Sequence, residues 1–174
     1  HARWDTARTL LNRALDGDWP GTIGVRRSTM ERCGGYDGNV LFENFELVRT
    51  VRAAGGVEFV ARDIFVRRLP PTTGHFFSQR VRQAYDEFAR PWRLGLALSL
   101  GPAAIFLWTR RRFDYLIVLA SLSVCLAEFG RRRAGGRRVF PATSALWAPA
   151  WVAERALTSW IALALRISGR GIVY

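Results

Sequence analysis

The stretch that decides how this sequence is interpreted runs from residue 34 to residue 56. It reads Gly-Gly-Tyr-Asp-Gly-Asn-Val-Leu-Phe-Glu-Asn-Phe-Glu-Leu-Val-Arg-Thr-Val-Arg-Ala-Ala-Gly-Gly. The glycines at its start permit a tight turn with positive φ angles. Apolar residues then recur at helical spacing, and Gly55-Gly56 is a typical helix stop. The stretch therefore predicts a glycine-rich turn followed by a helix that ends near residue 54.

Two carboxylates, Glu43 and Glu46, fall in the expected first turn of this helix. The helix dipole favours negative charge there and keeps a carboxylate ionised. An ionised carboxylate where a loop enters a helix is well placed to act as a general base. The alternative is an ordinary surface helix, because acidic residues are common in the first turn of any helix.

The flanking segments predict a mixture of strands and helices. Short β-prone runs at 22–25, 57–61 and 64–66 are typical of strands. Residues 7–15 have the apolar spacing of a short helix. Asp16-Gly-Asp18 has the form of a metal-binding pair, but its position after a helix and before Trp-Pro-Gly favours a solvated turn.

Residues 76–90 predict an amphipathic helix. Gln79 and Arg82 fall on its polar side, and the apolar stripe on the other side consists of Phe77, Val81, Tyr85 and Phe88. Such a helix beside hydrophobic segments is expected to lie in the membrane interface. Arg82 can pair bidentately with a diphosphate, or it can form a plain helix pair with Asp86.

The chain becomes strongly apolar after Pro91, at 92–108, 113–129 and 139–165. The first two runs each span roughly 25 Å as helices, which suits two thin membrane crossings or one re-entrant hairpin. A buried helical hairpin of a soluble protein is a third alternative, which the flanking arginine clusters disfavour. Arg110–Arg112 between the first two runs conflicts with the positive-inside rule if both cross, whereas the later cluster at 131–138 obeys it. We favour two crossings.

Composition narrows the class of partner. The 174 residues carry a formal net charge of +12, and every basic residue other than the two histidines is arginine. This charge indicates an anionic partner, and its position beside apolar runs favours a membrane. Nucleic acid is disfavoured because basic and aromatic residues do not alternate in a soluble domain. Two cysteines allow neither a disulfide framework nor a metal cluster, and they suit a reducing, cytosol-facing compartment.

Four short motifs follow one another along the chain: Gly21-Thr-Ile-Gly-Val-Arg-Arg27, Gly34-Gly-Tyr-Asp37, Glu43-Asn-Phe-Glu-Leu47 and Gln79-Arg-Val-Arg82. In this order they resemble the C-terminal half of a family-2 inverting glycosyltransferase. The resemblance covers roughly residues 21–90. It departs from the family at Asn44, where the catalytic aspartate is usual, and at Gln83, where tryptophan is usual.

The resemblance implies an α/β fold, the C-terminal part of a GT-A nucleotide-sugar domain at 1–74. An interface helix at 75–91 and a membrane-associated region at 92–174, with two to three membrane helices, would follow. The chain would then be a fragment of a multi-pass cell-membrane enzyme with its catalytic part facing the cytoplasm. We expect the fragment to be inactive without its missing N-terminal half, which would also bind most of a divalent cation, Mg²⁺ or Mn²⁺.

The implied activity transfers a sugar from a nucleotide-diphosphate donor to a lipid or polysaccharide acceptor. The implied catalytic positions are Glu43, Asn44 and Glu46, and the implied substrate-binding residues are Arg26, Gly34, Gly35, Asp37, Gln79 and Arg82. Because the Asn44 amide cannot take a proton at neutral pH, we expect Glu43 to be the base, with Glu46 in reserve. The alternative is a non-enzymatic membrane scaffold or a degenerate transferase module, and Asn44 is its best support.

Overall fold

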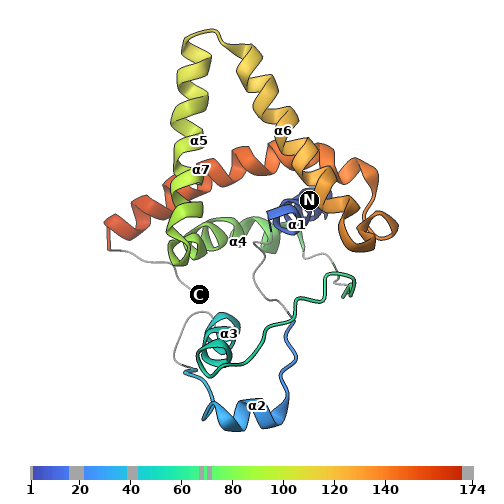
Figure 1. Ribbon diagram of the computed structural model, residues 1–174. Helices are drawn as coiled ribbons and strands as arrows, with labels where there is room; N and C mark the ends of the chain where they lie inside the picture. The colour runs from blue at the N-terminus through green and yellow to red at the C-terminus, as the bar shows by residue number, and fades with distance from the viewer. Residues whose placement is uncertain (1, 16–21, 39–42, 67–68, 70–71, 170–174) are drawn as a thin grey trace. The chain divides into compact units, whose positions relative to one another are not determined.

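The computed structural model describes residues 2–15, 22–38, 43–66, 69 and 72–169. The chain divides into two compact units, one of residues 17–65 and one of residues 1–16 and 66–174. Every regular element in the described residues is a helix, and none is a strand (Figure 1). The predicted α/β fold is therefore wrong for the part of the chain that the structure describes.

The smaller unit contains α2 (Arg27–Arg32) and α3 (Glu43–Ala53). The runs at 22–25, 57–61 and 64–66, which were expected to be strands, have no regular secondary structure. A strand is stable only when neighbouring strands take its backbone hydrogen bonds and its side chains pack on a core. Here Val57 and Phe59 are 91% and 85% exposed. The described residues thus form no sheet with which these β-prone runs could pair.

The predicted limits of the central helix are confirmed. α3 begins at Glu43 and ends at Ala53, and its Leu47 side chain is buried. Gly55 has a φ of 76°, and the Gly56 N–H donates to the Val51 carbonyl oxygen at 2.8 Å. A glycine in the left-handed region is a common helix terminator because it adopts that conformation without a Cβ clash.

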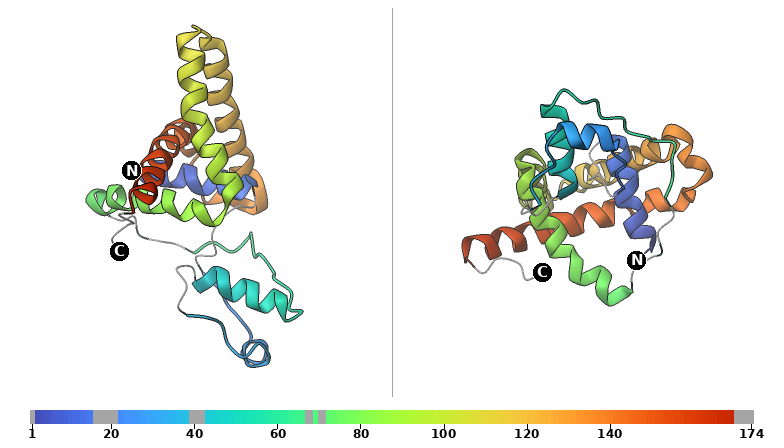
Figure 2. Two further views of the ribbon diagram at one scale, coloured as in Figure 1. Left: turned by 90° about the vertical axis from the view of Figure 1, so that its left-hand side faces the viewer. Right: turned by 90° about the horizontal axis from the view of Figure 1, so that it is seen from below.

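In its described residues, the larger unit has five α-helices and three short 3₁₀ helices. They are α1 (Ala2–Leu15), α4 (Thr73–Tyr85), η1 (Asp86–Ala89), α5 (Pro91–Thr109), α6 (Phe113–Arg132), η2 (Arg133–Arg138), η3 (Ala142–Trp147) and α7 (Ala148–Ile167). Helices α5 and α6 form a hairpin, and α1, α4 and α7 lie at its base (Figures 1 and 2).

The core of the larger unit joins α1, α6, η3 and α7. Its buried members are Leu10, Leu11, Ala127, Ala145, Ala148 and Trp151. The α1 backbone approaches Gly130 so closely that a methyl group there would overlap the Leu10 carbonyl oxygen. Helix α1 therefore packs with the residues after 66, although we expected it within a domain of residues 1–74. A compact unit is not a functional domain, so the functional division at 74 and 91 stays a prediction.

Helix α4 is buried along a face other than the apolar stripe, which was expected to face the membrane interface. Its buried residues are Phe76, Arg80 and Ala84, and Glu87 continues that face into η1. Phe77 from the expected apolar stripe is instead 55% exposed. The buried face is thus shifted by one residue and includes two charges, because α5 and α7 supply partners for them.

Among the residues that the structure describes, one helical segment, 113–138, is long and apolar enough to cross a membrane by length and composition, and 11% of its most apolar stretch is buried. The preceding helix α5 has 19 residues and few buried side chains. Arg93 near its start is paired with side chains of the larger unit. Its Nε lies 3.1 Å from Glu87 Oε2, and its Nη2 donates to Asn12 Oδ1 at 3.1 Å.

Candidate functional site

The glycine-rich turn adopts the backbone conformation that its sequence predicts at two of three positions. Gly34 and Gly35 have φ angles of 69° and 87°, whereas Gly38 is not in the left-handed region. The Gly35 N–H donates to the Met30 carbonyl oxygen at 3.3 Å, which closes the end of α2. No atom lies within 4 Å of a Cβ built at Gly34 or Gly35. The two glycines are therefore required by backbone conformation and not by a close neighbour.

The first turn of α3 carries the three expected catalytic positions. Glu43 and Asn44 are exposed, and Glu46 is half-buried. Glu46 Oε2 accepts a hydrogen bond from Arg49 Nη1 at 3.1 Å, so its charge is engaged within the helix. Glu43 has no hydrogen bond or ion pair with any described residue. Of the two carboxylates, Glu43 is therefore the more available to take a proton.

The remaining substrate-binding positions fall into both units. Arg26 is exposed at the start of α2, where its carbonyl oxygen accepts from the N–H groups of Thr29 and Met30. Asp37 is exposed in the glycine-rich turn. Both belong to residues 17–65, whereas Gln79 and Arg82 belong to the larger unit. The structure thus describes the two parts of the expected site separately.

Helix α4 brings Gln79 and Arg82 together, as the sequence predicted. Arg82 Nη1 donates to Gln79 Oε1 at 3.4 Å, and both side chains are half-buried. Their spacing of three places them on one side of the helix. Asp86 lies one turn further, and burial raises its pKa to about 6 although Arg82 and Arg155 oppose the shift.

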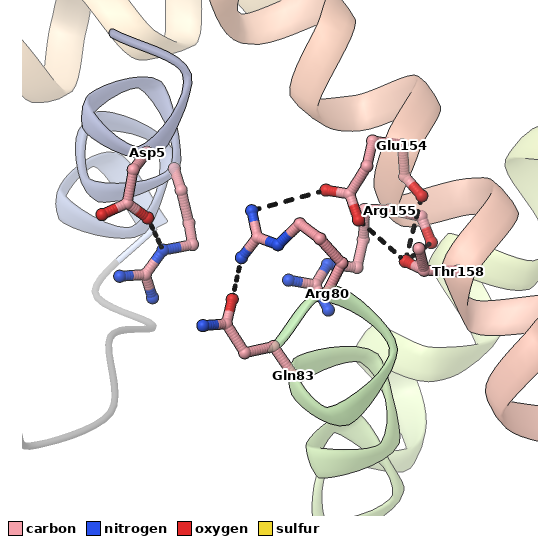
Figure 3. Close-up of polar contacts among 7 residues, drawn as sticks. Asp5, Arg80, Gln83, Glu154, Arg155 and Thr158 are labelled. Atoms are coloured by element: carbon pink, nitrogen blue, oxygen red, sulfur yellow. Dashed lines mark hydrogen bonds and ion pairs between the residues drawn. The ribbon is translucent and has the colours of Figure 1, made fainter. Parts of the chain in front are cut away.

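A buried ionic cluster between α4 and α7 was not predicted from the sequence. Arg80 is 3% exposed, and its Nη1 lies 3.7 Å from Glu154 Oε2 on α7 (Figure 3). Arg80 also donates to Gln83 Oε1. Glu154 Oε1 in turn accepts from Thr158 Oγ1 at 3.1 Å. The Glu154 carboxylate therefore links α7 to α4 through Arg80, while Thr158 contacts it from the same helix.

Arg155 is the second buried guanidinium of this cluster. It is 5% exposed, and its Nε and Nη1 have no hydrogen-bond acceptor among the described residues. Its guanidinium lies 5.3 Å from the centre of the Trp151 ring. Burial lowers its pKa to about 10, with Glu154 and Glu87 opposing the shift. Burial also lowers the pKa of Arg80. Arginine side chains stay protonated in proteins. The two buried positive charges therefore need the nearby carboxylates to compensate them.

The sequence did contain a signal for this cluster. Charged residues are rarely buried unless they are paired, and the adjacent Glu154 and Arg155 interrupt an apolar run. Such interruptions indicate a buried partner elsewhere in the fold. Sequence alone does not identify that partner, because Arg80 is more than seventy positions away.

The expected divalent cation was assigned mainly to residues outside this sequence, so the described residues do not test it. They contain no group of three or more His, Cys, Asp or Glu side chains that can hold a metal ion. Residues 16–18, which carry the Asp-Gly-Asp sequence, lie outside the described residues. The cation stays an expectation, and no step of the chemistry below depends on it.

Comparisons with known proteins were made at three levels. Family models, curated proteins and solved structures all gave no significant match to this chain.

Proposed function

We propose that the chain is part of a membrane-bound glycosyltransferase that moves a sugar from a nucleotide-diphosphate donor to a lipid or polysaccharide acceptor. The observation that carries the proposal is the order of the four motifs in residues 21–82, followed later in the chain by a helical segment long and apolar enough to cross a membrane. Local geometry agrees with it at two points. Glu43 is an exposed carboxylate without a partner among the described residues, and Gln79 and Arg82 form a pair on α4.

The proposed chemistry is a single displacement. The Glu43 carboxylate accepts the proton of the acceptor hydroxyl, whose oxygen then attacks the anomeric carbon of the donor sugar. The bond to the diphosphate oxygen breaks, and the diphosphate leaves with the bonding electrons. Arg82 offsets the negative charge that develops on this leaving group, since a guanidinium pairs bidentately with phosphate oxygens. Asn44 can orient the hydroxyl but cannot accept its proton.

Two membrane crossings, through α5 and α6, complete the proposal. Trp92 and Trp108 are each 65% exposed, and about 24 Å of helix separates them, which suits the two interfaces of one bilayer. A re-entrant hairpin would leave Arg110–Arg112 in the hydrocarbon, where each arginine costs about 2.5–3.5 kcal/mol on insertion scales. Crossing places the three arginines in the opposite headgroup region, and the catalytic part then faces the cytoplasm.

A non-enzymatic membrane scaffold or degenerate transferase module is the second candidate. Asn44 at the expected aspartate position favours it, because the base that the family uses is missing there. The two candidates differ in whether Glu43 is needed for turnover, so one substitution distinguishes them.

The test uses the complete protein to which the chain belongs, in native membranes, with radiolabelled nucleotide-diphosphate sugars. We expect Glu43→Gln to retain donor binding and to lose turnover by about 10²–10⁴-fold, the usual contribution of a general base. Glu31→Gln is the matched control, because Glu31 is an exposed acid paired with Arg27 on α2. Wild-type turnover in Glu43→Gln would reject Glu43 as the base. Absence of transfer from any donor in the wild type would favour the scaffold.

A further inference from the structure

Five arginines, at 131–133 and 137–138, lie at the end of α6 and in η2, and they differ in what they bind. Arg131 donates to both oxygens of Glu128, at 2.6 and 2.8 Å. Arg132 donates to Glu128 Oε1 at 2.7 Å. One carboxylate therefore engages both guanidiniums, which fixes them against their own helix.

Arg133, like Arg13 of α1, binds backbone carbonyl oxygens instead of a carboxylate. Arg133 Nη1 donates to the Arg13 and Ala14 carbonyl oxygens at 2.8 and 3.3 Å. Arg13 donates to the Gly130 and Arg133 carbonyl oxygens at 3.3 and 2.7 Å. The last carbonyl oxygens of a helix have no backbone N–H group to accept from. These two guanidiniums donate the missing hydrogen bonds where α1 and α6 end.

Arg137 and Arg138 remain without such partners. Both are exposed, and neither has a hydrogen bond or ion pair with a described residue. Positive φ angles at Ala134 and Gly135 turn the chain after α6 and set the two arginines in η2 beyond that turn. Exposed apolar side chains follow them, Val139 directly after η2 and Leu146 and Trp147 in η3. The segment 137–147 thus presents unpaired positive charge together with apolar side chains.

We propose that the segment 137–147 is a docking surface for the headgroups of anionic phospholipids. It directly follows the helix that is long enough to cross a membrane. Arginine clusters immediately beside such a helix attract anionic lipids, and each arginine strengthens attachment by roughly fivefold. The neighbouring apolar side chains suit the boundary between headgroups and acyl chains, which a free phosphate does not provide. The proposal does not depend on the glycosyltransferase assignment.

The structure distinguishes the unpaired arginines from the paired ones, whereas net charge treats them all alike. If charge alone mattered, every arginine near the membrane would contribute equally. The geometry assigns lipid binding to Arg137 and Arg138, because Arg131, Arg132 and Arg133 are already engaged by a carboxylate or by helix-end carbonyl oxygens.

The test reconstitutes the full chain in nanodiscs of equal amounts of phosphatidylcholine and phosphatidylglycerol. Native mass spectrometry then measures how strongly phosphatidylglycerol is enriched among the lipids that remain bound. We expect Arg137→Gln/Arg138→Gln to lower this enrichment about tenfold or more. The matched control is Arg131→Gln/Arg132→Gln, which removes the same charge from arginines that Glu128 already engages. It is expected to keep most of the enrichment.

Folding of Arg137→Gln/Arg138→Gln is checked by its melting temperature in phosphatidylcholine alone. This temperature is expected to be unchanged, because Arg137 and Arg138 are exposed. Undiminished enrichment in Arg137→Gln/Arg138→Gln would overturn the proposal. Equal losses in the two double variants would also overturn it, since they would indicate attraction by overall charge. Inorganic phosphate is added in a further arm. Displacement of phosphatidylglycerol by millimolar phosphate would assign the site to free phosphate instead of lipid.

Discussion

Removing the charge of Glu154 is expected to destabilise the larger unit strongly. Glu154→Gln keeps the size of the side chain, and its amide oxygen can still accept the hydrogen bond from Thr158 Oγ1. It leaves the buried Arg80 without its carboxylate. At the observed 3.7 Å, two unit charges attract each other by roughly 4 kcal/mol at an effective dielectric constant of about 20. This agrees with the roughly 3–5 kcal/mol that is lost when one partner of a buried pair is removed.

Thermal unfolding of the chain in nanodiscs measures this effect. A loss of about 3–4 kcal/mol corresponds to a fall in melting temperature of roughly 10–15 °C for a unit of this size. Glu31→Gln is the control, because its pair with Arg27 is exposed and such pairs contribute less than about 1 kcal/mol. Arg80→Met/Glu154→Leu should lose less than Glu154→Gln alone, since no lone charge remains at this pair. If Glu154→Gln melts within 2 °C or so of the control, the cluster does not hold α4 on α7.

Three further predictions follow from other parts of the structure. Because the pKa of Asp86 is raised from 3.8 to about 6, the folded state binds its proton more tightly, so this contribution to stability is complete below about pH 4 and is lost as the pH rises to about 6. Asp86→Asn should remove that slope, up to about 2–3 kcal/mol, in unfolding measurements across this range; an unchanged slope would assign it to another group. Gly130→Ala should lower the melting temperature by 10 °C or so, as overpacking costs about 1–3 kcal/mol or more, whereas Gly95→Ala, with open space around it, should not. In the complete protein, Arg82→Ala should weaken donor binding in calorimetry, and Arg82→Lys should recover little because a point charge replaces a bidentate fork; equal affinity in all three proteins would leave Arg82 a structural role.

Several features followed from the sequence because their causes are local. Glycine alone adopts positive φ without strain, so the turn at Gly34 and Gly35 and the stop at Gly55 could be predicted from residue type. The apolar runs after Pro91 fixed the lengths of α5 and α6 in the same way, since a helix satisfies its backbone hydrogen bonds within itself. The placement of Glu43 in the first turn of α3 also depended only on neighbouring residues.

Other features depended on partners that are distant in the chain. The β-prone runs at 57–61 and 64–66 are not strands because a strand needs neighbours, and the described residues supply none. Helix α4 buries Arg80 instead of Phe77 because the carboxylate that compensates the guanidinium comes from Glu154 on α7. Helical periodicity identifies the faces of a helix, but the charge and shape of the opposing element decide which face is buried. That choice is made only when the helices meet.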